Sequence, residues 1–266
     1  FRGIHLINYG VYPGTVPVQD VFEGNSIDGT IVNTSGVIGS EAIRISNVEP
    51  PSLTGTTATF TKNSFTNYTT AINNSTNVIL LAANNYWGSP CGPAPVIGNA
   101  TVSPWYVDET MTTTRATNPV GDQTFIPTMS TIEMNAGLAC AAPYSTITFE
   151  AGTVEYPGNI IIPDGREHLT IVLADGVKIN ANSPCFTVEA DYTTIKAQNI
   201  GMAACVTVAG SNGIDVADGV VNLTVDGLEI YGPGNDGIHF NGVITDVVLK
   251  DNFIHDLAGN GVFFGA

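Results

Sequence analysis

A 24-residue period in the second half of the chain limits what it can fold into. Ile147, Ile171 and Ile195 follow one another at intervals of 24 residues, and the series resumes at Val225 and Leu249 after one interval of 30. A second series with the same period places an aliphatic residue directly after an Asn-Gly or Asp-Gly pair. Its members are Ile214, Ile238 and Val262. Two series that share one period and absorb one insertion indicate a stacked repeat architecture.

Each repeat holds two or three short alternating strands separated by Gly, Asn or Asp, and no helical pattern intervenes. One such unit cannot bury its apolar residues alone. If the chain coils so that each turn lies about 4.8 Å from the previous one, backbone groups pair in parallel ladders and like residues stack. The sequence therefore predicts an all-β parallel β-helix. We expect the Asn-Gly and Asp-Gly pairs at corners that require a left-handed backbone.

An apolar residue followed three positions later by Asn recurs in both halves of the chain. We expect these asparagines to occupy the same kind of inward corner, where side-chain amides bond to one another and to turn backbone. Sugar binding by the amides is the alternative interpretation. The asparagines are Asn25, Asn63, Asn84 and Asn252.

The segment NNYWGSPCGP, residues 84–93, combines aromatic bulk with Gly and Pro. A β-helix that ends bluntly exposes unpaired strand edges and an open apolar core. Trp87 and Trp105 are expected to plug that end, while Gly and Pro stop another coil from forming. Carbohydrate stacking by these two rings is the alternative.

Two segments, NNSTNVILLAANNYWGSPCGP and NDGIHFNGVITDVVLKDNFIHDLAGNGVFF, resemble those of right-handed parallel β-helix proteins of the pectin-lyase-like superfamily. In many members of that superfamily an N-x-W-G…G-P…P-W signature marks the last coil. The resemblance covers most of the chain outside about residues 106–130, and it implies a right-handed β-helix. The matching residues are Asn85, Trp87, Gly88, Gly92, Pro93, Pro104 and Trp105.

The order of these signals predicts two β-helical bodies in tandem. Residues 1–106 would be the C-terminal part of a first β-helix, and the polar, aperiodic stretch within 107–130 would be a linker. Residues 131–266 would be the N-terminal part of a second β-helix, whose start is covered by a short helix. Ser130 and Glu133 form a capping-box pattern at the beginning of that helix. Both chain ends fall inside repeats, so we expect the polypeptide to continue or copies to join end to end.

Composition limits the classes of molecule that the chain could bind and suggests where it is located. The net charge is 8 − 24 = −16, which would repel nucleic acid. No apolar run approaches the roughly 20 residues needed to span a bilayer. The chain is rich in Thr and Asn, contains little Lys and has an even number of cysteines. Together these features suggest an extracellular or cell-surface location. Formal N-glycosylation acceptors stand at Asn33, Asn67, Asn73, Asn74, Asn99 and Asn222.

The four cysteines permit three pairings, and without a C-x-x-C or Cys/His cluster they do not indicate a metal site. We favour Cys185–Cys205 within the second body and Cys91–Cys140 between the two bodies.

The pectin-lyase-like superfamily contains polysaccharide lyases, hydrolases and epimerases, so outward acidic residues are candidates for catalysis. Asp215 and His239 are 24 residues apart and should lie side by side on neighbouring coils, where they could transfer a proton or hold a cation. A simple surface pair is the alternative. Asp236 aligns with Asn212 and Asn260 and is interpreted as a turn residue.

These observations favour a non-catalytic extracellular protein: a fibre, sheath or adhesin-like stalk that associates end to end. The rival hypothesis is a polysaccharide lyase or hydrolase that acts around Asp215 and His239, with Ca²⁺ as candidate cofactor. A third hypothesis is a glycan-binding module that uses exposed aromatic residues such as Tyr231. Asp226 and Lys250, also 24 apart, are expected to form an ion pair across coils.

Overall fold

The chain is described by a computed structural model that covers residues 2–8, 19–28, 41–47, 57–76, 78–116, 121–180 and 183–265. It divides into two compact units, Phe1–Asn118 and Pro119–Ala266. The fold is mainly β with one helix, arranged as a parallel β-solenoid of about 8 turns. This confirms the architecture predicted from the period.

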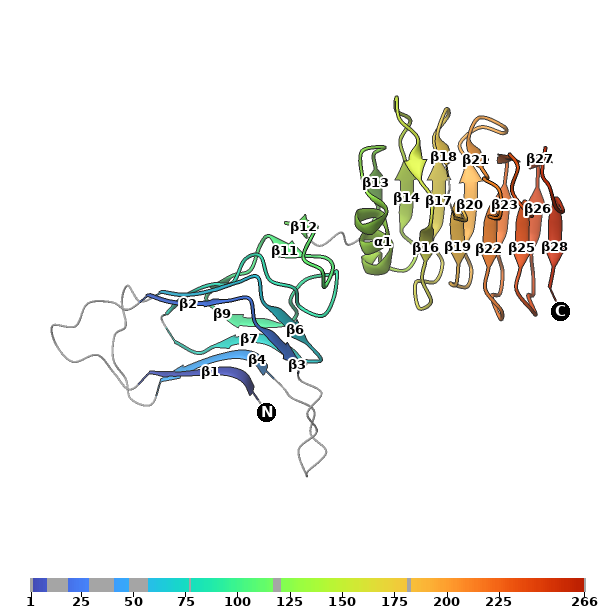
Figure 1. Cartoon of the computed structure of the whole chain (residues 1–266). Coiled ribbons are helices and arrows are strands. Elements are labelled where there is room, and N and C mark those ends of the chain that lie inside the picture. Colours follow the sequence, from blue (N-terminus) through green and yellow to red (C-terminus); the bar gives the residue numbers. More distant parts are fainter. Residues whose placement is uncertain are drawn as a thin grey trace. The chain divides into compact units, whose positions relative to one another are not determined.

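Three parallel sheets form the second unit, and from Thr146 onward each coil contributes one strand to each of them (Figure 1). The first sheet contains β13 (Gln123–Phe125), β14 (Thr146–Phe149), β17 (Thr170–Leu173), β20 (Thr194–Ala197), β23 (Thr224–Asp226) and β26 (Val248–Lys250). The second contains β15 (Tyr156–Pro157), β18 (Lys178–Asn180), β21 (Ala204–Val206), β24 (Glu229–Tyr231) and β27 (Phe253–His255). The third contains β16 (Ile160–Ile162), β19 (Phe186–Val188), β22 (Ile214–Val216), β25 (Ile238–Phe240) and β28 (Val262–Phe264).

The strand register follows the sequence period. Ile147 pairs with Ile171, and Ile171 pairs with Ile195, so the series lies in one column of the first sheet. The column continues through Val225 to Leu249. On the third sheet the second series forms its own column, with Ile214, Ile238 and Val262 on successive coils. These inward aliphatic residues form the core, because alternation along a strand buries every second side chain.

One helix, α1 (Thr131–Cys140), covers the first coil of this unit (Figure 1). The capping box is confirmed: Ser130 Oγ accepts from the Glu133 amide at 3.3 Å, and Glu133 Oε2 accepts from the Ser130 amide at 2.7 Å. Met134 and Leu138 are fully buried in the core. The helix thus fills the end of the core that would otherwise be open.

Parallel pairing also builds the first unit. One sheet contains β1 (Arg2–Asn8), β4 (Glu41–Asn47), β7 (Thr70–Asn74) and β9 (Val96–Gly98); another contains β2 (Gln19–Glu23), β5 (Thr57–Thr61), β8 (Ile79–Leu81) and β10 (Ala100–Thr101). The third side begins with β3 (Ser26–Asp28) and β6 (Ser64–Thr66). Parallel bridges from Ser64 to Tyr86 and from Tyr86 to Tyr106 carry it across two more coils.

The last pairing of the first unit reverses direction. β11 (Trp105–Tyr106) pairs antiparallel with β12 (Thr114–Arg115), so the chain folds back along the final coil. The stretch expected to be a linker, 107–130, therefore contains two strands, β12 and β13. β13 pairs with β14 and opens the first sheet of the second unit.

Two tryptophans lie buried near this end of the first unit. Trp87 stacks on Phe65 at 4.9 Å between ring centroids, and Trp105 Nε1 donates to the Pro90 carbonyl at 3.1 Å. A Cβ on Gly92 would lie 2.7 Å from the Trp105 ring, so only glycine permits this packing. Burial leaves little ring surface for a sugar, which favours the capping interpretation over carbohydrate stacking.

The glycines of the Asn-Gly and Asp-Gly pairs are expected at corners with a left-handed backbone, and the structure differs from that prediction. Gly213, Gly237 and Gly261 do not have a left-handed backbone. Instead, a Cβ on Gly213 would lie 2.4 Å from the Gly237 carbonyl oxygen, and one on Gly237 would lie 2.5 Å from the Gly261 carbonyl oxygen. Gly213 and Gly237 are required because consecutive coils approach closely there, whereas the nearest atom to a Cβ on Gly261 would lie 3.8 Å away. The left-handed turns are formed by other residues.

Candidate functional site

The candidate catalytic residues lie on the outer face of the third sheet. The central residue of β19, β22, β25 and β28 points outward in each coil, while its two neighbours in β19, β22 and β25 are buried. Asp215 pairs with His239 in register, as the period predicts. Thr187 precedes Asp215 in this column, and Phe263 follows His239.

The imidazole of His239 is held by a carboxylate of its own coil. His239 Nδ1 lies 2.8 Å from Asp236 Oδ2, three residues earlier in the chain. Its ring also stacks on Phe263, with 4.8 Å between centroids. Because a carboxylate accepts at Nδ1, the nitrogen that faces away from Asp236 is Nε2, and the side chain is partly exposed.

Asp236 also joins a ladder of corner side chains. Its amide donates to Asn212 Oδ1 at 3.1 Å, and its Oδ1 accepts from the backbone and side-chain amides of Asn260 at 2.8 and 2.9 Å. Burial alone would raise the pKa of the Asp236 carboxyl, but the hydrogen bonds from His239 and Asn260 outweigh it and lower that pKa. The turn role expected for Asp236 is present, together with a contact to His239 that the sequence interpretation missed.

Asp215 has a corresponding partner on its own coil. Asn212 Nδ2 donates to Asp215 Oδ1 at 2.7 Å, so Asn212 and Asp215 repeat the i, i+3 relation of Asp236 and His239. This spacing was visible in the sequence and is the signal that would have linked Asp236 to His239. The cross-coil neighbours Asp215 and His239 are therefore each oriented by a residue of their own corner.

This arrangement can accept or release a proton at an oriented imidazole. In many enzymes a carboxylate holds the imidazole of a histidine in the orientation in which that imidazole acts as a general base. A glycoside hydrolase needs two carboxyl groups that lie about 5–9.5 Å from each other. In the outward column the only carboxylate among the described positions is Asp215, since Thr187 precedes it and His239 and Phe263 follow it. The second nearby carboxylate, that of Asp236, already accepts hydrogen bonds from Asn260 and contacts His239.

A second histidine has carboxylates on both ring nitrogens. His255 Nε2 lies 3.1 Å from Glu229 Oε1, and His255 Nδ1 lies 2.8 Å from Asp256 Oδ2. Tyr231 pairs with His255 in register and stacks on its ring at 5.4 Å. Glu229 is a diagonal neighbour on the same face of the sheet. A comparison of directly opposite positions does not reveal this contact, because Tyr231 is the residue opposite His255.

The asparagine corners largely match the prediction, with one correction. Asn63 Oδ1 accepts from the backbone and side-chain amides of Asn25, both at 2.9 Å. The next member of the ladder is Asn85, and the prediction of Asn84 was wrong by one residue: Asn84 has φ of 56° and lies beside Lys62, which has φ of 53°. Asn63 and Asn85 are fully buried.

Asn252 makes the same bonds in the second unit. Its Oδ1 accepts the Leu228 amide at 3.0 Å, and its Nδ2 donates to the Val225 carbonyl at 2.8 Å. Asn63 and Asn85 likewise donate to a carbonyl of the preceding coil. The amides of these inward corners are thus used within the protein.

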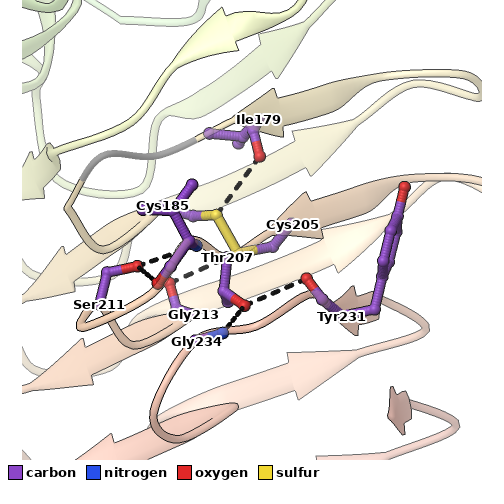
Figure 2. Close-up of a disulfide and its surroundings, with 9 residues drawn as sticks. Ile179, Cys185, Cys205, Thr207, Ser211, Gly213, Tyr231 and Gly234 are labelled. Carbon is purple, nitrogen blue, oxygen red and sulfur yellow. Dashed lines mark hydrogen bonds between the residues drawn. A yellow bond between two sulfur atoms is a disulfide. The ribbon is translucent and has the colours of Figure 1, made fainter. Parts of the chain in front are cut away.

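A disulfide links two coils inside the second unit (Figure 2). Cys185 and Cys205 are joined as predicted, and both are buried. Cys91 and Cys140 are disulfide-bonded as well, so none of the described cysteines is free. The pairing of Cys91 with Cys140, which would join the two units, stays a prediction.

The first sheet of the second unit carries a groove of about 350 Å³ on its outer face. Lys250 Nζ lies 3.0 Å from Asp226 Oδ2, which confirms the predicted ion pair across coils. Lys196 and Ile200 also line the groove. It is a shallow surface with charges of both signs.

Within the described ranges, no group of three or more His, Cys, Asp or Glu side chains is placed to hold a metal ion. The same ranges contain no helix with the length and apolarity needed to cross a membrane. No protein-family model, curated protein or solved structure matches the chain.

Proposed function

We propose that the chain is a structural, non-catalytic β-solenoid of an extracellular fibre, sheath or adhesin-like stalk. The finer architecture belongs to the same proposal: a right-handed coil of the pectin-lyase-like type, with the tail of one β-helix followed by the head of a second. The 24-residue period and the tryptophan signature at Trp87 and Trp105 support it.

The observation that carries the proposal is the use of polar side chains as ladders between coils. Asn25, Asn63 and Asn85 form one ladder in the first unit. Asp236 is the centre of another in the second unit. Such ladders hold register along a stack and leave buried polar groups satisfied, which suits a protein whose task is to keep its shape.

Location and association are further parts of the proposal. Disulfides form and persist in oxidising compartments, and those of this chain support an extracellular or surface location. End-to-end association belongs to the same proposal, and it is tested at Phe264, which is 63% exposed and pairs in register with the buried Phe240 of the preceding coil. Glycan remains a candidate partner, and the net charge of −16 speaks against nucleic acid.

Sedimentation velocity and negative-stain electron microscopy over a concentration series test the association. We expect linear assemblies that grow with concentration and that Phe264→Ser weakens. Ile200→Ser is the matched control, since Ile200 is as exposed as Phe264, at 67%, but lies on a turn. Strict monomers at high concentration, or equal effects of the two substitutions, would contradict end-to-end association.

A polysaccharide-active enzyme is the second candidate, and the contact of Asp236 with His239 beside Asp215 favours it. The assay is release of reducing ends or unsaturated uronates from a polysaccharide panel, with and without Ca²⁺. We expect no turnover. Activity that Asp215→Ala or His239→Ala abolishes would replace the structural proposal with the enzymatic one.

A further inference from the structure

A column of left-handed turn residues runs along the edge at which the chain enters the first sheet of the second unit. Each of five consecutive coils contributes one such residue, which lies two positions before the strand of that coil in the first sheet. Their φ angles lie between 53° and 67°. The members are Tyr144, His168, Tyr192, Asn222 and Asp246.

The first three members form a stack of aromatic rings. Tyr144 and His168 lie 4.4 Å apart between ring centroids, and His168 and Tyr192 lie 4.5 Å apart, with interplanar angles of 15° and 17°. One face of the Tyr192 ring is therefore covered by His168. Its other face is turned toward the next coil, and Tyr192 is 43% exposed.

Asn222 is the residue of the next coil at this position. The Tyr192 amide donates to the Val221 carbonyl at 2.8 Å, and the Val221 amide donates to Asp191 Oδ1, also at 2.8 Å. Thr194 pairs with Thr224 two residues later, so the register fixes Asn222 beside Tyr192. The uncovered face of the Tyr192 ring thus looks toward an asparagine.

The side chain of Asn222 is exposed, and among the described residues none forms a hydrogen bond or ion pair with it. It begins the acceptor triplet Asn222-Leu223-Thr224. Leu223 is fully buried, Asn222 is exposed, and alternation along β23 places Thr224 on the outer side of the coil. Both polar members of the triplet are presented outward at one turn.

Two other acceptor triplets of the chain are used for folding. Asn74 is 2% exposed, and its Nδ2 donates to the Val78 and Asn99 carbonyls at 2.9 and 2.8 Å. Asn73 is half-buried and donates to Glu41 Oε1 at 2.7 Å. A glycosylated amide keeps only one N–H, so Asn74 would lose one of its two bonds, and a sugar on either nitrogen would have to be accommodated against packed strands. The structure therefore separates acceptor triplets that a glycan fits from triplets that it does not fit.

We infer that Asn222 is an N-glycosylation site whose first sugar packs on the ring of Tyr192, and that Asn73 and Asn74 are unmodified. The amide nitrogen of Asn222 would form a bond to the anomeric carbon of a glycan carried on a polyprenyl diphosphate. The bond from that carbon to the diphosphate oxygen breaks, the polyprenyl diphosphate leaves, and the nitrogen gives up one proton. The compartment in which disulfides form is also the one in which such transfer occurs in secreted proteins.

Tyr192 provides a reason for the position of the sugar. The face of an aromatic ring carries partial negative charge and a large apolar surface. The C–H groups of a pyranose ring match it, and covering the free face removes apolar surface from water. The sugar would extend the existing stack of three rings by one member.

The test is secretion of the full chain from a host with an N-glycosylation pathway, followed by glycopeptide mass spectrometry before and after peptide N-glycosidase. We expect glycan on the Asn222 peptide and none at Asn73 or Asn74. Asn222→Asp and Thr224→Val should both abolish that glycan, and the aspartate keeps a residue that tolerates the left-handed turn. An unmodified Asn222 in the folded, secreted protein, or a glycan at Asn74, overturns the inference.

The role of Tyr192 has its own measurement. Removal of the glycan should lower the melting midpoint of the second unit by about 1–3 °C, and Tyr192→Ala should abolish that difference. Tyr144→Ala is the matched control, because Tyr144 is the exposed tyrosine at the opposite end of the same stack. If Tyr192→Ala and Tyr144→Ala leave the same glycan-dependent difference, the sugar does not pack on Tyr192.

Discussion

Asn85 Oδ1 accepts both the backbone amide and the side-chain amide of Asn63, at 2.9 and 3.0 Å, across two coils of the first unit. Asn85 Nδ2 donates in turn to the Phe60 and Ala82 carbonyls, at 2.8 Å each. Each amide of the ladder therefore bridges its own coil and the preceding one.

Substitution of Asn85 by alanine should destabilise the first unit strongly. The Asn63 backbone amide loses its acceptor, and the Asn63 side-chain amide keeps only the Phe22 carbonyl. Two carbonyls of the ladder also lose a donor, so we predict a loss on the order of 3 kcal/mol in the free energy of unfolding. Tryptophan fluorescence during denaturation measures this unit selectively, since Trp87 and Trp105 both lie in it. Asn84→Gly is the control, because glycine keeps the left-handed backbone of Asn84. Similar losses for the two variants would show that the ladder adds little.

The comparison of Asn84 with Asn85 shows what a period can and cannot predict. The interval of 24 residues predicts which aliphatic residues stack, because a register shift of one residue would move every side chain of a strand to the opposite face of the sheet. It does not say which of two adjacent asparagines points inward at a corner, because that depends on where the left-handed residue falls. Contacts between diagonal neighbours, such as Glu229 with His255, also escape a comparison of directly opposite positions.

A series of three glycines tests how closely the coils approach. Gly213→Ala and Gly237→Ala should each destabilise the second unit by about 1–3 kcal/mol, since the new methyl group meets a carbonyl oxygen of the next coil. Gly261→Ala should be nearly neutral, because the nearest atom to its Cβ is 3.8 Å away. Circular dichroism during denaturation gives the three values. Equal effects at all three positions would contradict the packing explanation.

The Cys185–Cys205 disulfide is expected to stabilise the second unit. The two cysteines are 20 residues apart and buried at the centre of the solenoid. Their joint replacement by alanine should lower the free energy of unfolding by about 3 kcal/mol. Denaturation of the double variant and of the wild-type protein, monitored by circular dichroism, measures the difference. Added reductant should leave the folded wild-type bond intact because solvent does not reach it, and rapid reduction of the native protein would disprove that protection.

The last two described coils are expected to be stabilised by a proton on His255. Hydrogen bonds to Asp256 first and to Glu229 second raise the pKa of the His255 imidazole above its ordinary value. The folded state therefore binds the proton more tightly than the unfolded state. Its contribution is fully present below the unfolded-state pKa of about 6.5, and it is lost as the pH rises through the higher folded-state pKa.

Hydrogen exchange measured through that window tests this prediction locally. The Phe253 amide, which donates to the Leu228 carbonyl at 2.9 Å, reports on the strand that contains His255. Its protection should fall as the pH rises above about 6.5, after correction for intrinsic exchange. His255→Gln should abolish that fall, because glutamine can hydrogen-bond to one carboxylate but carries no titrating proton. His168→Gln is the control, since His168 lies between two tyrosine rings and, among the described residues, forms no hydrogen bond or ion pair with a carboxylate. A fall that persists in His255→Gln would assign the pH dependence to another group.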